Sequence, residues 1–190
     1  MTEDPLRLAV IIGSTREGRF GPVVARWFIG EARHRSDMTI DLIDLGDVDV
    51  PAVYPSHRDT AVQAFTERID QADAFVVVTP EYNHGYPASL KQAIDLAHVE
   101  WRAKPVGFVS YGGMSGGLRA VEQLRQVFAE LHAVTVRDTV SFHMAHARFD
   151  TSGEPHDPDG CNAAAKTMLD QLAWWARALR DAKAVRPYAA

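Results

Sequence analysis

Residues 6–22 read Leu-Arg-Leu-Ala-Val-Ile-Ile-Gly-Ser-Thr-Arg-Glu-Gly-Arg-Phe-Gly-Pro. The first seven residues are almost continuously aliphatic, which is typical of a strand buried on both faces of a parallel sheet. The loop from Gly13 to Pro22 then leads into a segment with helical periodicity, Val23 to Arg33. Pro22 suits the first helical turn, where its missing N–H is not needed. A strand, a glycine-rich polar loop and a helix in this order predict an anion site at the helix N-terminus.

Two common nucleotide-binding loops do not match this segment. Gly13 and Gly18 have the spacing of a P-loop, but Arg19 and Phe20 follow where Lys and Ser/Thr are required, and the pattern is not Gly-x-Gly-x-x-Gly. A phosphomonoester is instead expected to bind the Ser14 hydroxyl, the Arg16 guanidinium and backbone amides of residues 19–23. A flexible polar loop that binds nothing is the alternative interpretation.

The same alternation of strand and helix continues along the chain. The predicted strands are Leu6 to Ile12, Thr39 to Asp44, Ala74 to Thr79, Pro105 to Ser110 and a less regular fifth from Ala133 to Phe142. The predicted helices are Val23 to Arg33, Val62 to Ala72, Ala88 to Ala97, Leu118 to Leu131 and Asn162 to Ala184. This order predicts an α/β fold, a flavodoxin-like, doubly wound five-stranded parallel sheet in a three-layer α/β/α sandwich. We expect residues 1–190 to form a single domain.

Composition narrows the range of functions. The chain has 190 residues, 46% of them hydrophobic, and a net charge of -5, so it lacks the basic surplus expected of a nucleic-acid or anionic-membrane binder. Its one cysteine, Cys161, excludes an intrachain disulfide framework and favours a reducing cytoplasm. The acidic N-terminus and its short apolar run resemble neither a signal peptide nor a membrane span. We expect a cytoplasmic protein that acts on small molecules.

Two further loops follow predicted strands. Residues 79–87 read Thr-Pro-Glu-Tyr-Asn-His-Gly-Tyr-Pro, a stiff loop whose tyrosine rings suit a flat heterocycle, although a rigid turn without a ligand has the same features. Residues 110–117 read Ser-Tyr-Gly-Gly-Met-Ser-Gly-Gly, which permits close approach of backbone to ligand. In a doubly wound sheet the ligand lies beyond the carboxyl ends of the central strands, so these loops and the first are expected to share one site.

Together the three loops resemble the NADPH-dependent FMN reductase family, which includes quinone, azo and chromate reductases. The resemblance rests on Gly13-Ser14-x-Arg16, Thr79-Pro80-Glu81-Tyr82-Asn83 and Ser110-x-Gly112-Gly113-x-x-Gly116-Gly117, and it covers roughly residues 6–145. It implies an FMN-dependent enzyme whose first loop holds the phosphate and whose other two loops hold the isoalloxazine ring. The candidate cofactor-binding residues are Gly13, Ser14, Arg16, Arg19, Phe20, Gly21, Pro22, Val23, Pro80, Glu81, Tyr82, Asn83, Ser110, Tyr111, Gly112, Gly113 and Gly116.

The resemblance also implies a reaction. Hydride would pass from NADPH or NADH to flavin N5 and then to a small-molecule electron acceptor, such as free flavin, a quinone or an azo compound, in a ping-pong order. Because the flavin carries the chemistry, no catalytic side chain is expected. The family often forms dimer contacts near Glu100-Trp101-Arg102, so a homodimer is implied. The chain departs from the family pattern at position 19, where Arg replaces a second serine, and Arg19 or backbone amides are expected to replace that hydroxyl.

Three alternatives remain at this stage. A flavodoxin-type electron carrier would also bind FMN, but Arg16, Arg19 and the modest net charge argue against it. A related fold that no longer binds flavin would serve as a binding module. His143, His146 and His156 suggest a metal, but no carboxylate or cysteine completes a regular ligand pattern, so we expect none.

Overall fold

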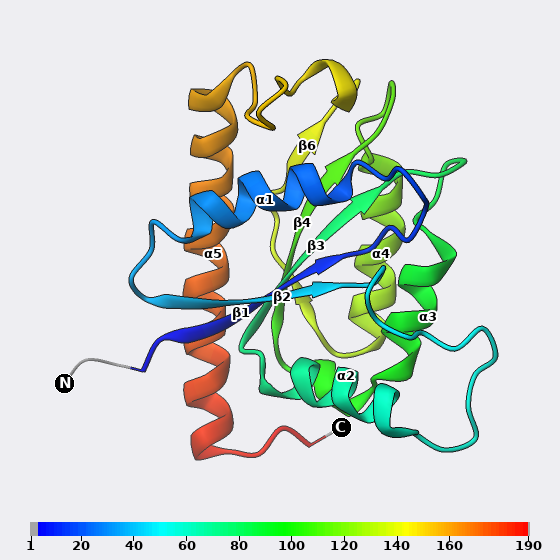
Figure 1. Ribbon diagram of the computed structural model, residues 1–190. Coiled ribbons are helices and arrows are strands. Elements are labelled where there is room, and N and C mark those ends of the chain that lie inside the picture. The colour runs from blue at the N-terminus through cyan, green and yellow to red at the C-terminus, as the bar shows by residue number, and fades with distance from the viewer. Residues whose placement is uncertain (1–3, 190) are drawn as a thin grey trace.

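The computed structural model describes residues 4–189, in which strands alternate with helices throughout (Figure 1). The strands are β1 (Leu6–Ile12), β2 (Met38–Asp44), β3 (Ala74–Pro80), β4 (Pro105–Tyr111), β5 (Val134–Thr135) and β6 (Val140–Phe142). The α-helices are α1 (Gly21–Ala32), α2 (Thr60–Gln71), α3 (Ala88–Leu96), α4 (Leu118–Glu130) and α5 (Pro158–Val185). Short 3-10 turns, η1 (Val99–Trp101) and η2 (Ala145–Ala147), follow α3 and β6.

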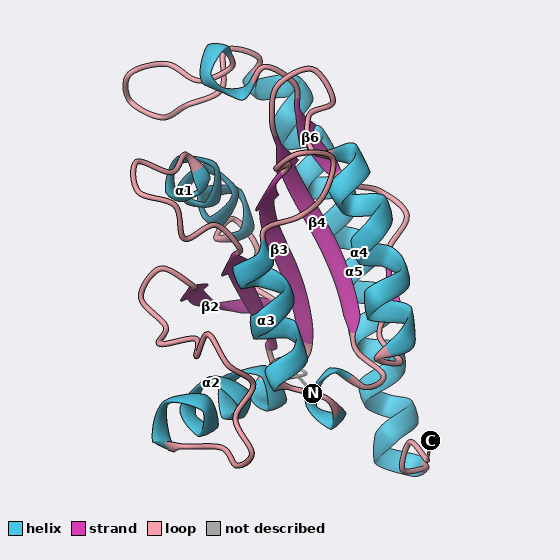
Figure 2. Cartoon of the chain, turned by 90° about the vertical axis from the view of Figure 1, so that its right-hand side faces the viewer, coloured by secondary structure: helices cyan, strands magenta, loops and turns pink. Residues whose placement is uncertain are grey.

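All strand pairs are parallel, in the order β2-β1-β3-β4-β5. Helices α1 and α5 pack on one face of the sheet, where Phe28 and Leu172 join the core, and α2, α3 and α4 pack on the other, where Phe128 does. Figure 2 is seen from the side of α3 and α4, and β3 and β4 are visible between these two helices. The α/β flavodoxin-like prediction is therefore confirmed.

The prediction of one continuous fifth strand from Ala133 to Phe142 is wrong. The segment divides into β5, which pairs with the start of β4, and β6, which pairs with its end. Between the two strands, side chains of the flanking helices form hydrogen bonds with the backbone. Arg125 of α4 donates to the carbonyls of Val136 and Arg137 at 2.8 and 3.0 Å. The amide of Asp138 donates to the Gln171 side chain of α5 at 3.2 Å. These groups are therefore unavailable to a continuous β-ladder.

Two other expectations need correction. Helix α1 begins at Gly21, and α5 begins at Pro158, where Asp157 caps it by accepting a bond from the Gly160 amide. Trp101 is fully buried against Phe75 and Phe128 of its own chain. This tryptophan is therefore a core residue and is not available for a subunit contact.

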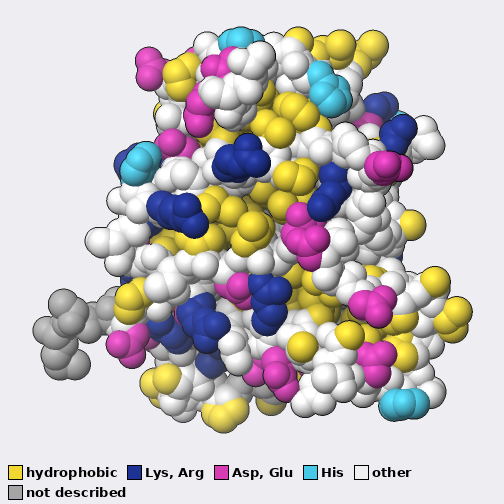
Figure 3. Space-filling view, viewed as in Figure 1, with side chains coloured by type: hydrophobic (Ala, Val, Ile, Leu, Met, Phe, Trp, Pro, Cys, Tyr) yellow, Lys and Arg dark blue, Asp and Glu magenta, His cyan; other side chains and the backbone are white. Residues whose placement is uncertain are grey.

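Charge on the surface is mixed. On the face shown in Figure 3, basic and acidic side chains alternate between patches of apolar surface. Among residues 4–189 no helix is both long enough and apolar enough to cross a membrane.

Candidate functional site

The loops that follow β1, β3 and β4 meet at the carboxyl edge of the sheet. The Gly13 amide donates to the Val78 carbonyl at 2.9 Å, and the Glu81 amide donates to the Tyr111 carbonyl at 3.1 Å. The Gly112 amide donates to the Phe142 carbonyl at 3.2 Å, which joins β6 to the same edge. The three predicted motifs are thus brought together by the sheet.

The start of α1 is an open helix N-terminus. Its first turn contains Pro22 and no acidic residue, and no side chain caps it. The amides of Arg19 and Val23 bond within the loop, to the carbonyls of Arg16 and Phe20. The amides of Phe20 and Gly21 donate to no acceptor within residues 4–189. Two N–H donors and the positive end of the helix dipole are therefore available to an anion.

Two arginines of this loop have different surroundings. Arg16 is exposed, and no carboxylate within the described chain pairs with it. Arg19 is largely buried and forms a two-pronged ion pair with Asp44 at the end of β2, and its Nη1 also donates to the Ser14 carbonyl at 2.8 Å. The guanidinium of Arg19 is therefore directed toward β2, whereas that of Arg16 is available to a ligand.

Ser14 lies beneath the start of α1 and is fully buried. The Tyr111 hydroxyl donates to its Oγ at 3.1 Å, and a Cβ at Gly21 would lie 2.7 Å from the same oxygen. Burial raises the pKa of the Tyr111 phenol, so this hydroxyl keeps its proton and remains a donor. The first and third loops are thus joined by a buried hydroxyl pair.

The loop after β3 folds into a tight turn. Tyr82 and Gly85 exchange backbone hydrogen bonds of 2.8 and 3.0 Å, and Asn83 and His84 between them have φ of 48° and 75°. Left-handed backbone is uncommon for residues other than glycine, and such positions concentrate at functional sites. Gln123 of α4 holds the turn by donating to the His84 carbonyl at 2.9 Å.

The glycine-rich loop after β4 has closed and open parts. Gly117 has φ of 86°, and a Cβ there would lie 2.6 Å from the Ser110 Cβ. The Ser110 hydroxyl donates to the Gly116 carbonyl at 2.8 Å, so it faces into the loop. Gly113 is exposed, and a Cβ there would meet no atom within 4 Å. Space for a flat ligand therefore lies on the Gly113 side of the loop.

An ion pair joins the second loop to the start of α4. The Glu81 carboxylate is only 4% exposed and accepts from the Arg119 amide at 3.2 Å and from Arg119 Nε at 2.5 Å. Burial opposes its charge, but hydrogen bonds from Ser115 and Arg119 outweigh burial and lower the pKa of Glu81. The carboxylate is therefore ionised at neutral pH.

Sequence reasoning missed the contribution of residues 143–149. The His146 ring packs against Phe20 at a tilt of 56° with centroids 4.6 Å apart, and His143 Nδ1 lies 2.8 Å from the Met114 carbonyl. The sequence suggests only a metal-binding role for these histidines, whereas in the structure His146 contacts the first loop and His143 contacts the third. Their position directly after the last predicted strand was the available signal.

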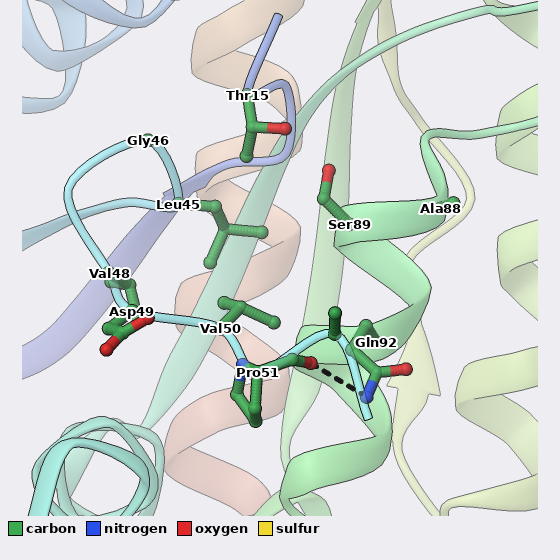
Figure 4. A pocket seen from close by; sticks show the side chains of 11 residues that line it. Thr15, Leu45, Gly46, Val48, Asp49, Val50, Pro51, Ala88, Ser89 and Gln92 are labelled. Atoms are coloured by element: carbon green, nitrogen blue, oxygen red, sulfur yellow. Dashed lines mark hydrogen bonds between the residues drawn. The ribbon is translucent and has the colours of Figure 1, made fainter. Parts of the chain in front are cut away.

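Sequence reasoning also missed a cavity of about 480 Å³ beside the first loop (Figure 4). Thr15 lies at one end, Ser89 and Gln92 of α3 form one wall, and the loop after β2 forms the other. The Gln92 amide donates to the Pro51 carbonyl at 3.2 Å and closes the base. Nothing in the composition of the loop after β2 predicts this wall.

The site fits a phosphorylated flat heterocycle, because free amides and a free guanidinium lie at one end and open space beside Gly113 lies at the other. The sequence profile of the NADPH-dependent FMN reductase family matches residues 6–147. An NAD(P)H-dependent FMN reductase of Schizosaccharomyces pombe is 38% identical over 130 residues, which are 64% of each chain. The chain thus spans slightly less than two thirds of that relative.

Longer matches extend the similarity to nearly the whole chain. A 2-hydroxy-1,4-benzoquinone reductase of a Burkholderia species is 30% identical over 186 residues, covering 90% of this chain and 97% of that protein. A flavoenzyme NAD(P)H:(acceptor) oxidoreductase of Paracoccus denitrificans has a similar structure, with a TM-score of 0.73 and 20% identity. That structural match covers 90% of this chain and 97% of the other, and it supports the fold.

Proposed function

The chain belongs to the NADPH-dependent FMN reductase family, and from this premise we propose that it transfers electrons from NADPH or NADH through bound FMN to a small-molecule acceptor. When bound, FMN supplies the redox chemistry, and the protein positions it and excludes competing reactions. The observation that carries the proposal is the open N-terminus of α1 beside the unpaired Arg16, at the edge where all three loops meet.

The phosphate is proposed to lie at the first loop, against the amides of Phe20 and Gly21 and the guanidinium of Arg16. A dianion gains charge-assisted hydrogen bonds there and interacts favourably with the dipole of α1. Arg19 acts through Asp44 by holding the loop in shape, and backbone amides take the place of the family's second serine. The buried Ser14 side chain stabilises the loop through its hydrogen bond with the Tyr111 hydroxyl.

The ring is proposed to lie between the turn at Tyr82 and Asn83 and the open side of Gly113. The rigid left-handed turn provides a flat backbone wall, and the missing side chain at Gly113 leaves the space that a ring requires. The Gly112 amide is already bonded to Phe142, whereas the Gly113 amide donates to no acceptor within residues 4–189 and is proposed as a donor to the ring.

The acceptor is proposed to be a quinone or a flavin, because relatives are named quinone reductases and FMN reductases. Both substrates would use the same ring face in turn, which gives ping-pong kinetics. Initial rates measured at several fixed acceptor concentrations test the order. Parallel double-reciprocal lines are expected, and intersecting lines contradict a shared face.

A cytoplasmic homodimer is proposed on the same family premise. Exposed apolar side chains near the end of α3 support it, since Tyr54 bonds to the Asp95 carbonyl there and stays 62% exposed, and Val99, which follows α3, is 59% exposed. Light scattering at micromolar concentration should give a dimer mass for the wild type and a monomer mass for Val99→Asp. A monomeric wild type contradicts the proposal.

One experiment tests the main function. The visible spectrum of the purified, FMN-reconstituted protein is recorded, and NADPH and NADH are then added separately without oxygen. Loss of flavin absorbance near its visible maximum within seconds is expected with at least one donor, and a quinone should restore it. A protein that binds FMN but is not bleached by either donor would instead be an electron carrier. A protein that does not take up FMN would refute the site.

A further inference from the structure

Helix α4, like α1, begins at the edge of the sheet where the site lies, but its N-terminus is occupied. Its first residue follows Gly117, which offers no capping side chain. The Glu81 carboxylate reaches across from the loop after β3 and accepts from the Arg119 amide, so it acts as the cap. A carboxylate at this position interacts favourably with the helix dipole. Of these two helix starts, only that of α1 is open to a ligand.

The same carboxylate is held by the Arg119 side chain. Arg119 Nε donates to Glu81 Oε1 at 2.5 Å, and Nη2 donates to the Ser115 hydroxyl at 3.1 Å. Glu81 belongs to the proposed ring-binding turn, whereas Ser115 and Arg119 belong to the glycine-rich loop and α4. A Cβ at Gly112 would lie 3.7 Å from the Glu81 Cβ, so the two walls already touch here.

The charges of the pair lie beside the proposed seat of the ring. Glu81 is almost fully withdrawn from water, and Arg119 is about half exposed. Charge in a water-poor site acts strongly on a neighbouring group. Two-electron reduction adds negative charge to a flavin, so an uncompensated charge beside the ring would change the relative affinity for its two redox states.

We propose that the Glu81–Arg119 pair is a positioning device that joins the two proposed ring-binding loops and keeps the charge beside the ring balanced. This inference rests on the proposed FMN site. Both side chains are engaged within the protein, Glu81 with Arg119 and Arg119 also with Ser115, so the pair acts on loop position and on local charge. They take no part in proton transfer.

The test uses three variants of the full chain. Glu81→Gln leaves the positive charge of Arg119, so reduced FMN should be favoured. Arg119→Met leaves the buried carboxylate, so reduced FMN should be disfavoured. In the double variant both charges are absent, and the ratio of affinities for the two redox states should return toward the wild-type value. Glu122→Gln, an exposed charge on the same helix, serves as the matched control.

The measured quantity is the midpoint potential of bound FMN, by equilibration with reference dyes. We expect shifts of opposite sign in the two single variants, each corresponding to a three- to tenfold change in relative affinity. A tenfold change equals about 30 mV for a two-electron couple. We also expect the dissociation constant of oxidised FMN to rise at least threefold in both single variants. Glu122→Gln should change neither quantity.

Shifts of the same sign in both single variants, or no shift in either, would overturn the charge-balance inference. If Arg119→Met does not fold, as judged by circular dichroism, Glu81→Gln and the double variant still decide the question, because they must differ in potential. A wild-type protein that does not bind FMN refutes the proposed function before any variant is compared. The two failures are therefore distinguishable.

Discussion

Replacing Arg16 by alanine tests where the phosphate lies. Arg16 is exposed and pairs with no carboxylate among residues 4–189, so its removal should leave the fold intact. A hydrogen bond to a charged group contributes about 1.5–3 kcal/mol. At about 1.4 kcal/mol for each tenfold change, the dissociation constant of FMN should rise by about 10- to 150-fold.

The assay compares FMN with riboflavin, which has the same ring and no phosphate. Each ligand is titrated into apoprotein and followed by quenching of flavin fluorescence. Arg16→Ala should weaken FMN binding and leave riboflavin binding unchanged. Added salt should reduce FMN affinity more in the wild type than in the variant, because the lost contact is electrostatic.

Arg19→Ala is the matched control from the same loop. Arg19 pairs with Asp44, and its loss leaves a carboxylate that is 14% exposed without its partner. This variant should lose about 1–3 kcal/mol of unfolding free energy, and FMN and riboflavin affinity should fall together. Equal weakening of FMN and riboflavin by Arg16→Ala, or no weakening of either, would show that the phosphate does not contact Arg16.

Gly113→Val should keep the wild-type melting temperature, because a Cβ at Gly113 meets no atom within 4 Å. The dissociation constant of FMN should rise by about 5- to 150-fold, since overpacking costs about 1–3 kcal/mol, and a variant purified with its full complement of flavin would contradict the proposed ring position. Tyr111→Phe should lower the free energy of unfolding, measured by urea denaturation, by about 1 kcal/mol through loss of the hydrogen bond to Ser14. The double variant Ser14→Ala/Tyr111→Phe should lose less than the sum of the two single variants, because both remove the same bond. Burial lowers the pKa of Lys104 to about 8, below an unfolded value of about 10.4. Between these values the unfolded chain binds more protons, so the free energy of unfolding should rise by up to about 3 kcal/mol from pH 8 to pH 10.5. Lys104→Met should remove that rise. If the free energy of unfolding of this variant has the same pH dependence as the wild type, the assignment of the rise to Lys104 is contradicted.

The local pattern of the sequence carries most of the fold and the location of the site. The aliphatic run of residues 6–12, followed by glycines and then a periodic helix, predicts β1, the first loop and α1, because strand burial and helix starts are local properties. Glycines at 116 and 117 mark left-handed backbone before α4. The carboxyl edge of the sheet follows from the order of elements alone.

The role of each polar side chain was decided by the tertiary structure. Arg16 and Arg19 lie three residues apart in the same loop, and the sequence does not distinguish their roles. Asp44, 25 residues from Arg19, forms its ion pair with Arg19 alone of the two. Ser14 meets Tyr111 across 97 residues, and Glu81 meets Arg119 across 38. The interrupted fifth strand depends likewise on Arg125 and Gln171 from two helices. A periodicity cannot encode such pairings, because they depend on which side chains the sheet brings within hydrogen-bonding distance. Sequence thus determined where the first loop stands, and folding determined which of its polar groups are paired within the protein and which are left free.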